Sequence, residues 1–204
     1  MIQLMVEDTV KLVMSHYFKL KDEKATLQRG SGPDFLIAGE AIELKGTNSD
    51  FDSAVRQFID YLLTGKYKGL RVAFPNDFLD AGRLAKFTAF CHLAAIINQW
   101  VPTYIIAEDE NLYYVRKFDY GKEIWSLVIQ EMCKQYSVKK EDLHDLARKA
   151  NEEFKNYDII MQDNIRRIVQ EKPDTTFLKS SLPQIHPSQG ALRKGFDDTS
   201  IMNK

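Results

Sequence analysis

A short apolar hairpin over residues 32–46 carries three charged side chains, and it constrains the fold more than any other stretch. Asp34 begins its first predicted strand, Ala38-Gly39-Glu40-Ala41 make the turn, and Glu43 and Lys45 lie two apart on the second strand. Because side chains alternate between the two faces of a strand, Glu43 and Lys45 point to the same face. Burying these charges among Ile and Leu costs free energy, a cost that is usually tolerated for chemistry. We therefore expect a functional site here.

Composition bounds the class of protein. The chain has 204 residues, of which 44% are hydrophobic and 28% charged, as in an ordinary soluble domain with one elaboration. The net charge of −1 gives no global signal for nucleic acid, although a local basic patch suffices to bind phosphate. Cys91 and Cys133 lack metal-ligand spacing, so we expect buried free thiols. Without a leader-like or membrane-spanning stretch, we expect an intracellular, cytoplasmic protein with no membrane partner.

Hydrophobic periodicity predicts an α/β order for residues 1–118. In chain order we expect a helix over 4–19, a short strand over 25–29, the hairpin over 34–46, a helix capped by Ser49 or Asp50 that ends at Leu63, a buried strand over 70–74, a long helix from Asn76 or Asp77 to about Trp100, and strands over 103–107 and 112–118. This order predicts one mixed sheet flanked by helices.

The sequence changes character after residue 118. Residues 119–136 and 139–171 are highly charged and have helical periodicity, so we expect a C-terminal helical extension over 119–172. This extension either packs on the core or forms a dimer interface. Residues 173–204 are rich in Pro, Gly and polar side chains, and they are predicted to form a flexible tail.

The residue types of the hairpin suit phosphodiester cleavage. That reaction needs a nucleophilic water near neutral pH and stabilisation of charge on the phosphate, and Mg²⁺ supplies both. The carboxylates of Asp34 and Glu43, on adjacent strands, can share one such ion with the backbone carbonyl of Leu44. Lys45 can orient the attacking water or neutralise charge on the phosphate. The alternative without a functional site is a surface hairpin on which Glu43 and Lys45 form a solvated ion pair.

Pro33-Asp34 followed by Glu43-Leu44-Lys45 resembles the signature of the PD-(D/E)xK nuclease superfamily. The resemblance implies a restriction-endonuclease-like core within residues 1–118, in which Asp34 and Glu43 bind metal and Lys45 is catalytic. Many members carry an acidic residue on the first helix near the metal, which implies the same role for Glu7, with Asp8 as the alternative.

Two further features are similar to particular branches of this superfamily. Gln57 and Tyr61 are four apart on the helix after the hairpin, as in RecB-like and phage exonucleases. The Gly-Ser-Gly-Pro-Asp entry to the hairpin resembles archaeal Holliday-junction resolvases, some of which use a serine before the motif. Ser31 is the counterpart in this chain.

The resemblance implies a metal-dependent deoxyribonuclease of Holliday-junction-resolvase type, which uses Mg²⁺ or, in its place, Mn²⁺. We expect double-stranded or branched DNA as the substrate and a homodimer that forms a basic groove from two subunits. Three alternatives stay open. The chain could be a RecB-like exonuclease, an inactive DNA-binding protein on the same fold, or a protein-binding module with a fortuitous motif.

Overall fold

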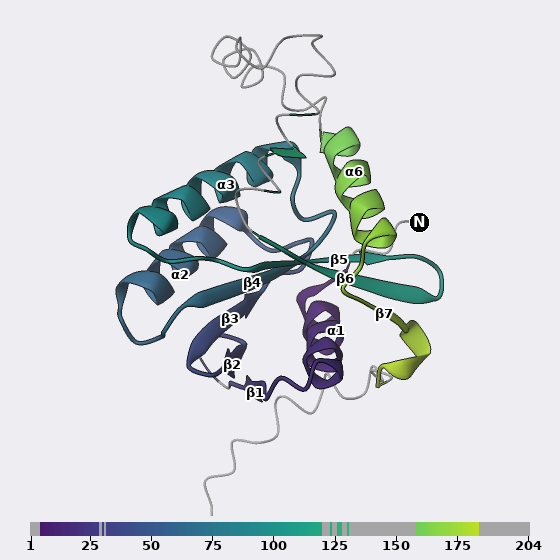
Figure 1. Cartoon of the computed structure of the whole chain (residues 1–204), viewed down its shortest axis with the longest axis horizontal. Coiled ribbons are helices and arrows are strands. Elements are labelled where there is room, and N and C mark those ends of the chain that lie inside the picture. Colours follow the sequence, from purple (N-terminus) through teal and green to yellow (C-terminus); the bar gives the residue numbers. More distant parts are fainter. Residues whose placement is uncertain are drawn as a thin grey trace, which may run out of the picture.

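The computed structural model describes residues 5–28, 30, 32–119, 123, 126–127, 130 and 158–183. These residues form a mixed α/β fold around a seven-stranded sheet whose strands follow chain order (Figure 1). The strands are β1 (Thr26–Leu27), β2 (Phe35–Ile37), β3 (Glu40–Leu44), β4 (Leu70–Pro75), β5 (Thr103–Glu108), β6 (Leu112–Phe118) and β7 (Thr175–Leu178). Strands β3, β4 and β5 are parallel, whereas the other neighbouring pairs are antiparallel.

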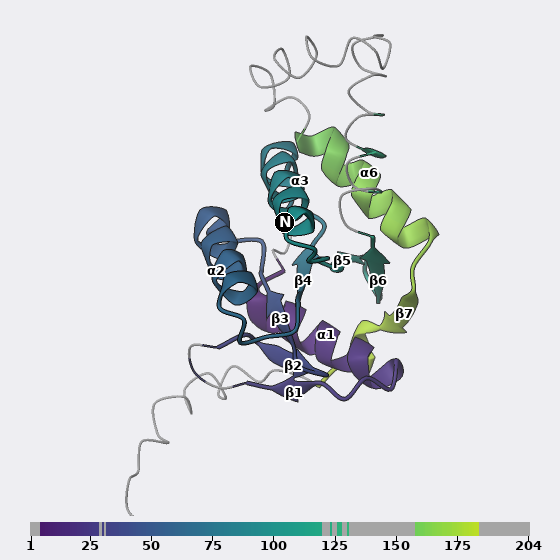
Figure 2. The same cartoon turned by 60° about the vertical axis from the view of Figure 1, so that its left-hand side comes forward.

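Helices cover both faces of the sheet (Figure 2). Helix α1 (Glu7–Leu20) packs on one face, where Phe18 lies in a core with Ile42 and Leu44 of β3. Helices α2 (Phe51–Leu63), α3 (Ala81–Ile96) and α6 (Asp158–Glu171) cover the other face, with a core rich in phenylalanine. Since Ile42 and Leu44 face α1, strand alternation directs Glu43 toward α2.

The predicted hairpin and the helix after it are present, but Glu40 and Ala41, expected in the turn, pair with β2 as the first residues of β3. Ala38 and Gly39 have positive φ angles of 53° and 88°, which make the tight turn between β2 and β3. Asp50 caps α2 by accepting a hydrogen bond from the Ser53 N–H, and α2 ends at Leu63 as expected. Ser49, the alternative cap, instead accepts a hydrogen bond from the Gly46 N–H at 3.1 Å.

The long helix after β4 starts later and ends earlier than expected. We predicted a start at Asn76 or Asp77, but the Asn76 N–H donates to the Ile106 carbonyl at 2.8 Å and continues the strand pairing. Helix α3 begins at Ala81, where Asp80 caps it by accepting from the Arg83 N–H at 2.7 Å. It ends at Ile96, and Asn98 then turns the chain with a φ of 59°.

The C-terminal part packs on the core. Ile165 and Val169 of α6 are buried in the same core as α2 and α3, which is one of the two alternatives for the extension. The flexible tail predicted over 173–204 is wrong for its first residues, because β7 pairs with β6 and a 3₁₀ turn, η3 (Lys179–Ser181), follows. Burial of the Phe177 ring stabilises this strand against the rest of the sheet.

Some expectations fall outside the described residues. These are most of the extension between 120 and 157, which includes Cys133, and the tail from residue 184. Cys91 is free and buried, as expected. In the described part of the chain, we find no helix with the length and apolar character that a membrane crossing requires.

Candidate active site

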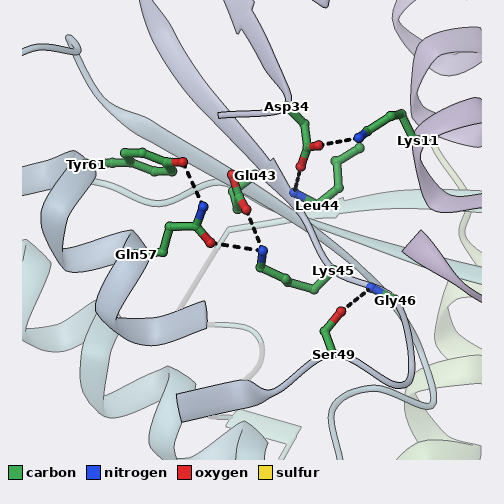
Figure 3. Close-up of polar contacts among 9 residues, drawn as sticks. All are labelled: Lys11, Asp34, Glu43, Leu44, Lys45, Gly46, Ser49, Gln57 and Tyr61. Carbon is green, nitrogen blue, oxygen red and sulfur yellow. Dashed lines mark hydrogen bonds and ion pairs between the residues drawn. The ribbon is translucent and has the colours of Figure 1, made fainter. Parts of the chain in front are cut away.

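Strands β2 and β3 separate at the point where the predicted site residues gather (Figure 3). Their pairing ends at Phe35 and Ile42. Beyond this pair, the Leu44 N–H donates to Asp34 Oδ2 at 2.9 Å. The carboxylate thus takes the place of the backbone carbonyl that would accept this bond in a continuing sheet. This bond holds the Asp34 carboxylate against the main chain of β3, next to Glu43.

Glu43 is buried, and only one of its two carboxylate oxygens has a hydrogen-bond partner in the described part of the chain. Its side chain is 4% exposed, and Lys45 Nζ lies 2.5 Å from Oε1. Oε2 is buried with no partner at hydrogen-bond distance among the described residues, and the Tyr61 hydroxyl lies near enough to interact with the Glu43 carboxylate. Burial raises the pKa of the Glu43 carboxyl to about 7; Lys45 opposes this rise, and the charges of Asp34 and Glu7 add to it. An unpaired buried oxygen is costly, and a cation or a hydrogen-bond donor would satisfy it.

Helix α2 provides a second partner for Lys45, in addition to Glu43. The Lys45 ammonium donates to Gln57 Oε1 at 3.0 Å, and Gln57 Nε2 donates to the Tyr61 hydroxyl at 2.9 Å. The spacing of four residues places Gln57 and Tyr61 on one face of the helix, as predicted. Burial and the charge of Glu43 raise the pKa of the Tyr61 phenol, so it stays neutral at physiological pH.

Lys11, a residue not expected from the sequence, pairs with Asp34. Lys11 Nζ lies 2.6 Å from Asp34 Oδ1. A signal for it exists in the sequence, because Lys11 follows Glu7 by four residues and therefore shares its helix face. Lys11 and Lys45 thus place one ammonium on each of the two carboxylates.

Gly46 is the second missed residue, and it explains how Glu7 is placed. A Cβ at Gly46 would lie 2.3 Å from the Glu7 backbone nitrogen, so the start of α1 lies directly on the end of β3. Glu7 is the first residue of α1, with Asp8 next to it. Ser31 lies outside the described residues.

The donor set fits a divalent cation in its chemistry. Within the described ranges, no group of three or more His, Cys, Asp and Glu side chains stands ready to hold a metal ion. Lys11 and Lys45 instead neutralise Asp34 and Glu43. The unpaired Glu43 Oε2 is the oxygen donor that a hard cation such as Mg²⁺ prefers, and Asp34 supplies a second carboxylate next to it.

The arrangement combines two adjacent carboxylates, a lysine held between a carboxylate and an amide, and a helix start beside them. Such a set can bind a cation, place an ammonium beside an anionic group and exclude bulk water from the buried carboxylate. Comparison with known proteins adds nothing to this geometry, since no family model, curated protein or solved structure matches the chain.

Proposed function

We propose that this protein is a metal-dependent deoxyribonuclease of the PD-(D/E)xK superfamily, which hydrolyses DNA phosphodiester bonds. One observation carries the proposal. Glu43 is buried with Oε2 unpaired, between Lys45 on one side and the Asp34 carboxylate on the other. A buried carboxylate of this kind is costly for stability, and metal-assisted hydrolysis gives it a purpose.

Asp34, Glu43 and the Leu44 carbonyl, with Glu7 at the start of α1, are the groups that would hold Mg²⁺. When bound, the ion would lower the pKa of a water and stabilise charge on the phosphate. Lys11 neutralises Asp34 in its absence.

Lys45 has its own part in the proposed reaction. Its ammonium is aimed by two contacts, to Glu43 Oε1 at 2.5 Å and to Gln57 Oε1 at 3.0 Å. Held in this way, it neutralises a phosphate oxygen or orients the attacking water without a reorganisation cost. Gln57, fixed by Tyr61, positions Lys45.

Two substrate classes follow from the resemblance. The Gly-Ser-Gly-Pro-Asp entry favours an endonuclease of Holliday-junction-resolvase type, for which a homodimer on branched or double-stranded DNA is the expected form. The second candidate is a RecB-like, end-directed exonuclease. The specific observation for it is the contact that joins Tyr61 and Gln57 to Lys45, because the Gln and Tyr pair is the feature shared with that branch.

The proposal is tested with purified full-length protein and four DNAs: closed plasmid, linear duplex, single strand and four-way junction. Each is incubated with Mg²⁺, Mn²⁺ or EDTA. We expect cleavage with either metal and none in EDTA. Preference for the junction supports the resolvase class, whereas a requirement for ends supports the exonuclease class.

Two variants of the site and one control variant complete this test. Glu43→Gln and Lys45→Ala should each lower the cleavage rate by at least about 10²-fold, as expected for the loss of groups that act on the reacting centre. Arg167→Gln, on the exposed side of α6, should cut like wild type. If wild-type protein cuts none of the four DNAs with either metal, the nuclease proposal is wrong.

A further inference from the structure

The loop between α2 and β4, residues 64–69, borders the candidate site and carries two exposed lysines. Lys66 and Lys68 are exposed, and neither has an ion-pair partner among the residues that the structure describes. Tyr67 between them is partly buried, and its ring meets Tyr61 edge-on with centroids 5.4 Å apart. A chain of contacts therefore runs from Glu43 through Lys45, Gln57 and Tyr61 to this loop.

Contacts to the β2–β3 turn hold the loop in position. The Lys68 N–H donates to the Gly39 carbonyl, and the Ala41 N–H donates to the Gly69 carbonyl, each at 2.9 Å. The stem of Lys68 lies across Gly39, where an added Cβ would be 3.2 Å from Lys68 Cδ. Lys66 Nζ lies over the Tyr67 ring, 5.3 Å from its centroid. Both lysines are thus carried by an anchored loop.

The positive charge of this loop is not cancelled by the carboxylate that packs against it. Glu40, which packs against Gly69, is paired with Arg71 at 2.5 Å. Gly39, beneath Lys68, lies four strand residues from Glu43, or about 13 Å at ~3.3 Å per residue. That distance is within the span of a few nucleotides of one DNA strand, so one bound strand can reach both places.

The opposite end of β3 has the opposite charge. Beyond Lys45 and Gly46, the Thr47 hydroxyl donates to Asp77 at 2.9 Å. Asp77 lines a cavity of about 450 Å³ together with Asp109, Glu110 and Asp163, and the carboxylates of this cavity outnumber its two cations, Arg166 and Lys179. Lys179 in this cavity is already paired with Glu108. This acidic end repels phosphate. A DNA strand bound at the site is therefore expected to run toward the lysine-bearing loop and away from this end of β3.

We propose that the DNA strand leaves the scissile phosphate across the loop over residues 64–69, where Lys66 and Lys68 bind backbone phosphates, and not across the acidic end of β3. The inference rests on the proposed function and names the surface that binds its substrate. Tyr67 positions the loop by packing on Tyr61. Tyr61 also accepts a hydrogen bond from Gln57, the residue that holds Lys45, so the same side chain contacts both the loop and the catalytic site.

The test measures binding separately from cleavage. The affinity of full-length protein for a fluorescent 20-base-pair duplex is measured by anisotropy in EDTA over a series of NaCl concentrations. Each lost phosphate contact lowers the slope of log K against log[salt] by about 0.9. We expect the double variant Lys66→Ala/Lys68→Ala to lose roughly one to two in slope and about tenfold in affinity at ~0.1 M salt. Lys66→Arg/Lys68→Arg should keep both.

A matched control removes two exposed lysines elsewhere. Lys19→Ala/Lys117→Ala, on α1 and β6, makes the same change in net charge and should leave the slope unchanged. If the loop variant keeps the wild-type slope, or if the control loses as much, the strand path is wrong. Wild-type binding with the expected loop dependence but no metal-dependent cutting contradicts the nuclease proposal alone. If wild-type protein does not bind DNA, the strand path is wrong as well.

Discussion

At the scale of single residues, the burial of Glu43 has a cost for stability that depends on pH. Its burial disfavours the charged carboxylate, and Lys45 compensates for only one of its two oxygens. The folded, metal-free protein therefore holds a proton on Glu43 at a pH at which the unfolded chain has already released it. This difference links stability to pH through one residue.

We predict that metal-free wild-type protein loses stability as pH rises from about 4.5 to about 7, the ordinary and the folded pKa of Glu43. The carboxyl with the raised pKa contributes most below 4.5, and the loss is on the order of 3 kcal/mol above 7. Glu43→Gln cannot ionise, so its free energy of unfolding should exceed that of wild type at pH 8 and approach it near pH 4. Urea denaturation in EDTA at several pH values measures this.

Glu110→Gln is the control for this pH prediction, because it removes an exposed carboxyl in the turn between β5 and β6. Its pH profile should follow that of wild type. Parallel profiles for wild type and Glu43→Gln would show that Glu43 is not the group that links pH to stability.

At the scale of secondary-structure elements, the contact of α1 with β3 at Gly46 places the acidic start of the helix beside the site. The backbone carbonyl of Met5 accepts from the Thr47 N–H at 3.0 Å, which holds the two segments together. Gly46 is needed for steric reasons, because its Cβ position is filled by the backbone of Val6 and Glu7. Its φ is not in the left-handed region.

Gly46→Ala should therefore destabilise the protein by about 3 kcal/mol, since a methyl group forced against backbone moves α1 away from β3. The same variant should weaken any metal-dependent cleavage, because Glu7 moves with the helix. Thermal denaturation by circular dichroism measures the change in Tm.

Gly82→Ala is the matched control for Gly46→Ala. It adds the same methyl group within α3, where the nearest atom is Asp80 Oδ1 at an ordinary 3.4 Å. There the lower entropy of the unfolded chain should raise stability by up to ~1 kcal/mol. Equal effects at the two glycines would contradict the close approach at Gly46.

At the scale of the whole molecule, the last described strand completes the sheet. Strand β7 lies at the β6 edge and brings Phe177 against His16 of α1 and Tyr113 of β6, with ring centroids 4.7 Å and 6.0 Å away. A segment after residue 173 therefore contributes to the core on the α1 face. The local composition of that segment, rich in polar residues, does not reveal this.

We predict that Phe177→Ala lowers the free energy of unfolding by about 3 kcal/mol, because it removes a buried aromatic ring and leaves a cavity. Leu178→Ala, the adjacent residue whose side chain is 55% exposed, should cost less than about 0.5 kcal/mol. Equilibrium urea denaturation compares the two. Similar small losses at both positions would mean that β7 does not contribute to the core.

The local parts of this fold could be predicted from the residues themselves. Asp50 was recognised as a helix cap because a side-chain oxygen there satisfies a free N–H, whatever the rest of the chain does. The start of α3 was misplaced because Asn76 forms a strand hydrogen bond to β5, a partner 30 residues away. Such a partner leaves no trace in local periodicity.

For the candidate site, the sequence by itself determined which side chains share a face. Strand alternation pairs Glu43 with Lys45, and helical periodicity pairs Gln57 with Tyr61. Only the tertiary structure brought Gln57 to Lys45 and left Glu43 Oε2 unpaired. It also gathered acidic side chains near one end of β3 and the two loop lysines near the other. The physical reason is that backbone geometry sets spacing along one element, whereas burial and charge at a site depend on how separate elements pack.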